Sequence, residues 1–345
     1  MRNHARIGNQ IIVATAQSPL LHDFKYPHRE VFYPYGFALL VRTNQKAILD
    51  IVRENWIEFS RAVQELKAHS QNHPPLELNV AVVGESKIAF PSVPAIRSQG
   101  NLMWFVSDAE HFGTCDFQSG IGYLWITPRT LADPEWLLYY FIEALGYALV
   151  GERYMAAIHS ACVAHQGRGI LLCGDSGAGK STLAYACARR GWSYVSDDGS
   201  FLLRDAQDSR IVGNPHRIRL RPPTASLFPE LQRFFPRVLP NGKEALQIRT
   251  KELPSIQIAD GARVECLVFL KRREGSPTTL APFSKQEAQI RMEASICFGR
   301  DSSQDEQKLC LKRVLRKDVF EMTYCETEAA IDCLEALLSG GSPAR

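Results

Sequence analysis

The sequence contains no paired-cysteine spacing, no long apolar run and no large excess of charge of either sign. Nine cysteines occur singly, without a C-x-x-C pair, among 345 residues. An odd number of unpaired cysteines indicates reduced thiols in a cytoplasmic protein and argues against a zinc site built from cysteines. We therefore interpret most of them as small core residues.

The sequence also lacks the features of a membrane or nucleic-acid-coating protein. Its richest apolar stretch, "WLLYYFIEALGYALVG" at 136–151, is interrupted by Glu143 and is typical of a buried helix. The opening "MRNHARIGNQIIVATAQSPL" lacks an apolar segment followed by a small-residue cleavage site, so we expect no signal peptide. With 40 basic and 37 acidic residues, any basic function must be local. We expect a cytoplasmic protein without nucleic-acid partners or a membrane span.

The length suggests about two domains. Residues 1–30 look irregular, residues 31–150 are expected to form a small α+β domain of unknown role, and residues 151–345 are expected to form a second domain. In the first domain we predict strands in "FALLVRT", "LELNVAVVG", "NLMWFVSD" and "GIGYLWITP", and helices within 45–70 and 134–150. The histidines of this part have no metal-like spacing and are expected at surface or loop positions: His69, His73 and His111.

The second domain begins with a predicted hairpin. "IHSACVA" and "GILLC" are short apolar strands joined by the turn-rich "HQGR". A helix in "STLAYACARR" should then end at Gly191, a residue suited to a helix cap. Further strands are predicted in "WSYVS", "GSFLL", "VECLVFLKRR" and "DVFEMTY", and a final helix in "EAAIDCLEALL".

The stretch "LLCGDSGAGKST", residues 171–182, fits the phosphate-binding pattern G-x-x-x-x-G-K-[ST] between a predicted strand and a predicted helix. Glycines let several backbone N–H groups approach a phosphate together, and the following helix N-terminus favours the anion. Lys180 can reach the β- and γ-phosphates, and the Ser181 hydroxyl can ligate Mg²⁺. The alternative is a glycine-rich turn that binds nothing. The candidate nucleotide-binding residues are Gly174, Asp175, Ser176, Gly177, Ala178, Gly179, Lys180, Ser181 and Thr182.

An acidic pair follows this loop closely. Asp197 lies 17 residues after Lys180, at the end of the next predicted strand, and Asp198 follows it. No N-K-x-D guanine motif follows the loop, and the late apolar strand "CLVFLKRR" ends in basic rather than acidic residues. If the strand before Asp197 is adjacent to the loop strand, both carboxylates lie at the phosphate edge of the sheet. One carboxylate could hold Mg²⁺ and the other could accept a hydroxyl proton. The alternative is a turn that caps a hairpin.

The stretch "NPHRIRLRPP", residues 214–223, carries alternating arginines. In a strand, Arg217, Arg219 and Arg221 would share one face. They could clamp phosphate oxygens or an acidic substrate surface, with Arg217 and Arg219 as the stronger candidates. The alternative is a charged, solvated edge strand.

Residues 158–203 resemble the C-terminal catalytic domain of HPr kinase/phosphorylase and its relatives. The resemblance rests on His159 at the opening of the hairpin, the G-D-S-G-x-G-K-S loop, "RRG" after the helix, and the Asp-Asp pair. It implies an α/β chain with a phosphoenolpyruvate-carboxykinase-like P-loop domain and a mixed sheet. It also implies ATP- and Mg²⁺-dependent transfer of phosphate to a protein serine or threonine, with Asp197 as general base, Asp198 near the metal and a supporting role for His159. From the residues alone, His159 could instead be a strand-end histidine bonded to backbone.

The sequence departs from this family in three places. Ser181 is followed by Thr182 where the bifunctional enzymes have Ser-Glu, their "LExRGxG" element is absent, and the N-terminal part does not resemble their regulatory domain. We therefore expect neither phosphorylase activity nor HPr itself as the substrate, and the sequence names no protein phosphoacceptor. A homo-oligomer stays open, because the HPr kinases are hexamers.

Two other functions remain open at this stage. Small-metabolite kinases also place an Asp on the strand after the loop helix, although their phosphate loop usually stands near the start of the chain. A nucleotide-gated binding module would carry the same loop without turnover.

Overall fold

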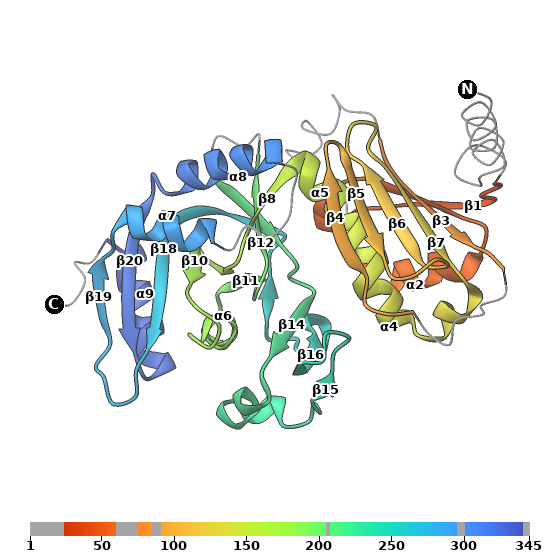
Figure 1. Ribbon diagram of the computed structural model, residues 1–345. Helices are drawn as coiled ribbons and strands as arrows, with labels where there is room; N and C mark the ends of the chain where they lie inside the picture. Colours follow the sequence, from red (N-terminus) through yellow and green to blue (C-terminus); the bar gives the residue numbers. More distant parts are fainter. Residues whose placement is uncertain (1–23, 60–74, 85–90, 205–207, 295–300, 341–345) are drawn as a thin grey trace, which may run out of the picture. The chain divides into compact units, whose positions relative to one another are not determined.

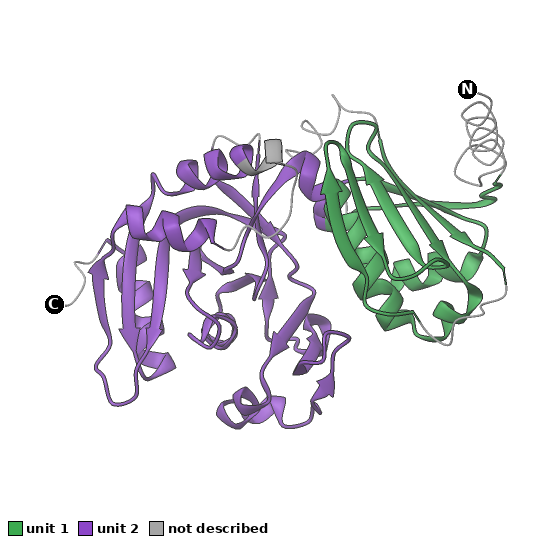
Figure 2. Cartoon of the chain, viewed as in Figure 1, with its two compact units in different colours: residues 1–34, 38–57, 72–149 green, residues 35–37, 58–71, 150–345 purple. Residues whose placement is uncertain are grey.

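The computed structural model describes residues 24–59, 75–84, 91–204, 208–294 and 301–340 (Figure 1). The protein is of the α/β class, and its two large sheets mix parallel and antiparallel strands. The described residues divide into two compact units (Figure 2): unit 1 takes those of 1–34, 38–57 and 72–149, and unit 2 those of 35–37, 58–71 and 150–345. His69 and His73 lie outside the described residues. No helix in the described part of the chain has the length and apolar character needed to cross a membrane.

Unit 1 is built on a seven-stranded sheet with the strand order β1-β2-β3-β7-β6-β5-β4. The four strands that the sequence predicted are confirmed as β2, β3, β5 and β7, whereas β1, β4 and β6 were not predicted. β1 begins at His28, inside the segment that we expected to be irregular. The bounds are β1 (His28–Phe32), β2 (Leu39–Thr43), β3 (Leu76–Val82), β4 (Ala95–Gln99), β5 (Leu102–Val106), β6 (Phe112–Asp116) and β7 (Ile121–Ile126).

Helices pack against this sheet, and small residues allow close approach both between the helices and between helix and strand. A Cβ added at Gly146 of α5 would collide with Trp56 of α2, and one at Gly113 of β6 would collide with Leu145. The predicted helix at 134–150 is present as three successive segments. Asp133 caps the N-terminus of the first segment, because its side chain accepts a hydrogen bond from the Trp136 N–H. The bounds are α2 (Lys46–Trp56), α4 (Pro134–Leu137), the π-helix η4 (Leu138–Ile142) and α5 (Glu143–Tyr154), with short 3-10 helices η2 (Pro34–Gly36) and η3 (Pro128–Ala132).

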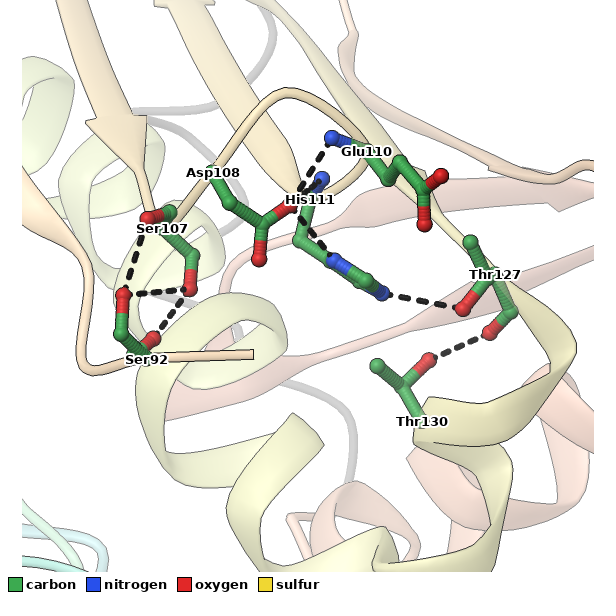
Figure 3. A network of polar contacts seen from close by, with 7 residues as sticks. All are labelled: Ser92, Ser107, Asp108, Glu110, His111, Thr127 and Thr130. Carbon is green, nitrogen blue, oxygen red and sulfur yellow. Dashed lines mark hydrogen bonds and ion pairs between the residues drawn. The ribbon is translucent and has the colours of Figure 1, made fainter. Parts of the chain in front are cut away.

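His111 lies in the loop before β6, which fits the expected surface or loop position, but its side chain is fully buried in unit 1. Its Nδ1 lies 2.8 Å from Asp108 Oδ1 and its Nε2 lies 3.0 Å from Thr127 Oγ1 (Figure 3). Thr130 Oγ1 donates in turn to the Thr127 carbonyl oxygen. Because both ring nitrogens have partners, this imidazole can be buried without an unsatisfied polar atom. It joins the loop before β6 to the segment after β7.

Unit 2 is built on a ten-stranded sheet with the path β17-β11-β9-β10-β18-β13-β12-β8, and β20 pairs with both β18 and β19. The predicted hairpin is confirmed as β9 and β10, which pair antiparallel, and the other predicted strands are confirmed as β11, β12, β18 and β20. The bounds are β8 (Met155–Ile158), β9 (Ala161–His165), β10 (Arg168–Cys173), β11 (Ser193–Ser196), β12 (Ser200–Leu203), β13 (Arg210–Gly213), β17 (Gln257–Ile258), β18 (Gly261–Arg272), β19 (Thr279–Pro282) and β20 (Asp318–Tyr324).

Both faces of this sheet are buried, which explains why its strands read as short continuous apolar runs. One core joins Val163 and Leu172 to α6 and α9, and the other joins Cys162 and Leu171 to α7 and α8. Gly191 follows α6 with φ +93°, which confirms the predicted cap. The helices are α6 (Lys180–Arg189), α7 (Lys285–Glu293), α8 (Asp301–Val314) and α9 (Thr327–Leu338), of which the sequence predicted α6 and α9.

A separate three-stranded sheet with the order β14-β16-β15 belongs to unit 2. Its strand β14 lies on the edge, and the buried Ile218 and Leu220 alternate with arginines along it. Ile218 and Leu220 join the core that contains α6. The bounds are β14 (Arg217–Leu220), β15 (Arg237–Val238) and β16 (Glu244–Arg249), with 3-10 helices η5 (Pro222–Leu227), η6 (Pro229–Leu231) and η7 (Thr250–Glu252).

The cysteines behave as the sequence predicted. All the described cysteines are free thiols, and most are buried: Cys115, Cys162, Cys173, Cys187, Cys266 and Cys310. Burial raises the pKa of the Cys162 thiol and the Cys173 thiol to about 12, so these two stay protonated and apolar at neutral pH.

Candidate functional site

The glycine-rich loop runs from the end of β10 to the start of α6. Three of its glycines have positive φ: Gly174 (139°), Gly177 (94°) and Gly179 (92°). A Cβ on Gly174 would lie 3.0 Å from the Leu270 carbonyl oxygen, whereas the nearest atom to a Cβ on Gly177 would be Arg221 Nη1 at 3.7 Å. Backbone conformation therefore disfavours any other residue at all three positions, and close packing adds a second constraint at Gly174 but not at Gly177.

Lys180 is the first residue of α6, and its side chain folds back over the loop. Its Nζ donates to the Gly174 carbonyl oxygen at 2.7 Å and to the Asp175 carbonyl oxygen at 3.3 Å. Burial lowers the pKa of Lys180, and the negative charge of Asp198 opposes that shift. The ammonium group is thus held beside the backbone groups that a phosphate would approach.

The acidic pair and His159 reach the edge of the sheet where the loop lies. The strand before Asp197 is not adjacent to the loop strand, because β9 lies between β10 and β11. β9 is antiparallel to both neighbours, so β10 and β11 are parallel and end at one edge, where β9 begins. The two carboxylates follow β11, and His159 stands just before β9.

Asp197 is buried, with a relative exposure of 8%. Its Oδ2 accepts a hydrogen bond from the Arg219 backbone N–H, and its carbonyl oxygen accepts one from Ser181 Oγ at 3.3 Å. Burial raises the pKa of Asp197 to about 6, although the Arg219 N–H and the Arg219 charge both lower it. A carboxylate with this pKa can exchange a proton near neutral pH.

Asp198 is exposed and pairs with His159. Its Oδ1 lies 3.2 Å from His159 Nδ1, and the two side chains are 65% and 44% exposed. The side chain of His159 therefore contacts an acidic group of the predicted site. The pair at 197 and 198 does lie in the turn between β11 and β12, so the turn interpretation describes its backbone position.

The three alternating arginines in and just after β14 make different contacts. The Arg219 N–H binds Asp197, whereas Arg217 pairs in register with Arg249 at the opposite end of β14 from Arg221. Arg221, just after the strand, donates from Nη2 to Ser176 Oγ at 2.9 Å. Of the three side chains, Arg221 is the one that contacts the loop, although the sequence analysis had ranked Arg217 and Arg219 above it. The alternation that marked those two residues extends to Arg221 and was the available signal.

A second contact lies beside this one. Thr182 Oγ1 and Thr224 Oγ1 are 3.3 Å apart, so η5 also touches the first turn of α6. Thr224 is buried, with 5% exposure, and no motif in the sequence marked it.

Three buried serines lie next to the acidic turn and form hydrogen bonds with one another's segments. Ser196 Oγ and Ser200 Oγ are 2.7 Å apart, and Ser200 Oγ donates to the Ser160 carbonyl oxygen at 2.9 Å. These contacts tie the end of β11, the start of β12 and the residue after His159 to one another. Sequence analysis missed them, because single serines in apolar strands carry no pattern.

The residues around Asp198 fit Mg²⁺ only if the nucleotide supplies further ligands. No group of three or more His, Cys, Asp or Glu side chains among the described residues could hold a metal ion. The Ser181 hydroxyl and the exposed Asp198 carboxylate are oxygen ligands, the type that Mg²⁺ prefers. Because Mg²⁺ usually binds one or two protein ligands plus substrate phosphates and waters, this small donor set is compatible with a nucleotide-borne magnesium ion.

No family model matches the chain, and no curated protein matches it in sequence. Among solved structures, that of the Hpr(Ser) kinase/phosphatase from Coxiella burnetii matches with a TM-score of 0.29 and 13% identity, over 54% of this chain and 99% of that chain. A likeness at this level is distant and does not assign a family or an activity to the chain.

Proposed function

We propose that the protein is an ATP- and Mg²⁺-dependent phosphotransferase that transfers phosphate to the hydroxyl group of a serine or threonine in a protein. The observation that carries the proposal is the hydrogen bond from Ser181 Oγ to the Asp197 carbonyl oxygen. It joins the first turn after the glycine-rich loop to the acidic turn, so groups suited to phosphate binding and to proton transfer lie together. The choice of a protein acceptor rests on the sequence resemblance.

Each residue has a role in this proposal. Backbone N–H groups of 174–182 bind the phosphates, with Lys180 and Arg221 adding positive charge. Ser181 and Asp198 would hold Mg²⁺, which when bound neutralises phosphate charge. Asp197 accepts the proton of the acceptor hydroxyl, and His159 orients Asp198.

Arg219 positions Asp197 through its backbone N–H and stabilises the carboxylate through its charge. Arg217 is retained as a candidate contact for substrate rather than for the nucleotide, because it lies at the far end of β14 from the loop.

The direct test is incubation of the purified protein with γ-labelled ATP, Mg²⁺ and a lysate of its host. Label should appear in a protein, and Asp197→Asn should abolish the transfer while ATP still binds. Transfer of label to a small molecule alone would identify a metabolite kinase. ATP binding without any transfer would leave a nucleotide-gated binding module.

The pH dependence of turnover separates the two carboxylates. If Asp197 is the base, kcat should fall as the pH drops below about 6, where this carboxyl becomes protonated. Asp198→Asn should retain residual activity with the same acidic limb and a higher Mg²⁺ requirement. Residual activity in Asp197→Asn, with none in Asp198→Asn, would exchange the two roles.

A further inference from the structure

The last residue of β20, Tyr324, supports the glycine-rich loop from the side of the core. Its side chain is buried, with 1% exposure, and its hydroxyl donates to the Ala178 carbonyl oxygen at 2.9 Å. β20 is parallel to β18, which is parallel to β10, so all three strands end at the edge of the sheet where the loop begins (Figure 1).

The same hydroxyl occupies the space beside Gly179. A Cβ on Gly179 would lie far inside van der Waals contact of the Tyr324 hydroxyl oxygen and 3.4 Å from the ring carbon that bears it. Gly179 also has φ +92°, which residues with a Cβ rarely adopt. Two independent constraints therefore require glycine at this position, and Tyr324 imposes one of them.

The hydrogen bond also sets the direction of one peptide group. In a trans peptide the C=O and the following N–H point in opposite directions. Because the Ala178 carbonyl points at Tyr324, the Gly179 N–H points away from it, to the other side of the loop. Burial raises the pKa of Tyr324 to about 12, so the hydroxyl keeps the proton that it donates at any physiological pH.

We propose that Tyr324 is a positioning residue of the phosphate-binding loop, which aims the Gly179 N–H at a bound phosphate by holding the Ala178 carbonyl. This inference rests on the proposed nucleotide binding. It adds a residue from the C-terminal part of the chain, outside the loop motif, the acidic pair and the arginines.

The first test is Tyr324→Phe, measured as the dissociation constant for Mg²⁺–ATP by calorimetry. Without this bond the Ala178–Gly179 peptide must be ordered when the phosphate binds, so the dissociation constant should rise, up to the about two- to tenfold that one net hydrogen bond is worth. The matched control is Tyr185→Phe, because the Tyr185 hydroxyl is buried in the same core and donates to Glu230 at 2.8 Å without contacting the loop. Tyr185→Phe should lower the Tm while leaving the dissociation constant unchanged.

The second test uses two glycines with nearly equal φ. Gly177 (94°) and Gly179 (92°) both have a positive φ that disfavours alanine, but only Gly179 faces the Tyr324 hydroxyl. Gly179→Ala should therefore lower the Tm more than Gly177→Ala. Adding Tyr324→Phe should recover much of that excess in Gly179→Ala and none of the loss in Gly177→Ala.

The outcomes distinguish this inference from the proposed function. If the wild-type protein binds no ATP, both fail, even if the Tm series shows that the contact exists. If the wild type binds ATP and Tyr324→Phe binds it equally well, the positioning role alone is wrong. Equal Tm losses for the two alanine variants would also overturn it, because the hydroxyl would then not press on Gly179.

Discussion

At the scale of single residues, Asp197 and Asp198 show how two adjacent carboxylates acquire different properties. Asp197 is buried and bonded to the Arg219 N–H, and burial raises its pKa to about 6. Asp198 is 65% exposed and pairs with His159. The side chain changes from buried at Asp197 to exposed at Asp198 because β11 ends there and the turn to β12 begins.

The raised pKa of Asp197 predicts a pH dependence of stability. The unfolded chain ionises this carboxyl near its ordinary pKa, whereas the folded state retains the proton up to about pH 6. Rising pH between those values therefore favours unfolding. We expect the wild type to lose about 1–2 kcal/mol relative to Asp197→Asn between pH 5 and pH 7.5. Chemical denaturation of both proteins at the two pH values measures this, and parallel curves would contradict it.

Arg221 and Arg217 allow a comparison within one arginine series. Arg221 donates to Ser176 Oγ of the loop, and Arg217 lies at the opposite end of β14. Arg221→Gln should raise the KM for ATP about tenfold, the order expected for a charge-assisted contact to phosphate. Arg217→Gln should change it less than twofold. An equal effect of both substitutions in steady-state kinetics would mean that the clamp extends along the whole strand.

At the scale of elements, the β9–β10 hairpin positions both the loop and His159. Its two-residue turn has Gln166 at φ 50° and Gly167 at φ 79°, the signs that a type I′ turn requires. Glycine adopts this conformation freely, but glutamine does not, so Gln166 is a local cost inside the hairpin.

Gln166→Asn should therefore stabilise the protein. Asparagine tolerates positive φ, and Asn-Gly is a favoured type I′ pair. We expect the free energy of unfolding to rise by about 0.5–1 kcal/mol, measured by denaturant titration. Gly167→Ala is the opposite case and should lower the free energy of unfolding by a similar amount. If Gln166→Asn is neutral or destabilising, this turn geometry is wrong.

Elements whose signal is local were predictable from the sequence, whereas strand pairing beyond the β9–β10 hairpin was not. The hairpin, the helix ending at Gly191 and the buried strand β18 follow from apolar runs and turn residues. Helix α7 was missed because Ala288 and Met292 are its buried residues in an otherwise polar segment. The insertion of β9 between β10 and β11 was missed because sequence order does not determine strand order.

The same distinction applies to the candidate site. The loop and the acidic pair lie within one short stretch and were predicted from their spacing, whereas His159 was predicted only from the family resemblance. Tyr324 touches Ala178, and Arg221 touches Ser176, from parts of the chain remote in sequence. The Tyr324 contact leaves no trace in the sequence pattern, and the alternation that includes Arg221 does not show that its side chain reaches Ser176, so only the fold reveals these two contacts.

At the scale of the whole molecule, the two units have separate sheets, and the candidate site lies in unit 2. Mg²⁺–ATP should therefore slow amide hydrogen exchange in 174–182 and leave β3 and β7 of unit 1 unchanged. Mass spectrometry with and without nucleotide measures this peptide by peptide. Protection confined to unit 1 would place the nucleotide elsewhere and contradict the proposed site.

Unit 2 includes residues 35–37 from the N-terminal part of the chain, which matters for expressing unit 2 alone. Phe37 stacks on Tyr154 with ring centroids 4.3 Å apart, and Tyr35 meets Phe201 edge to face at 4.8 Å. A fragment that starts at Val150 would leave Tyr154 and Phe201 without these aromatic neighbours, exposing apolar surface that invites aggregation. A minimal version of unit 2 needs Tyr35–Phe37 supplied with it, for example through a short designed linker.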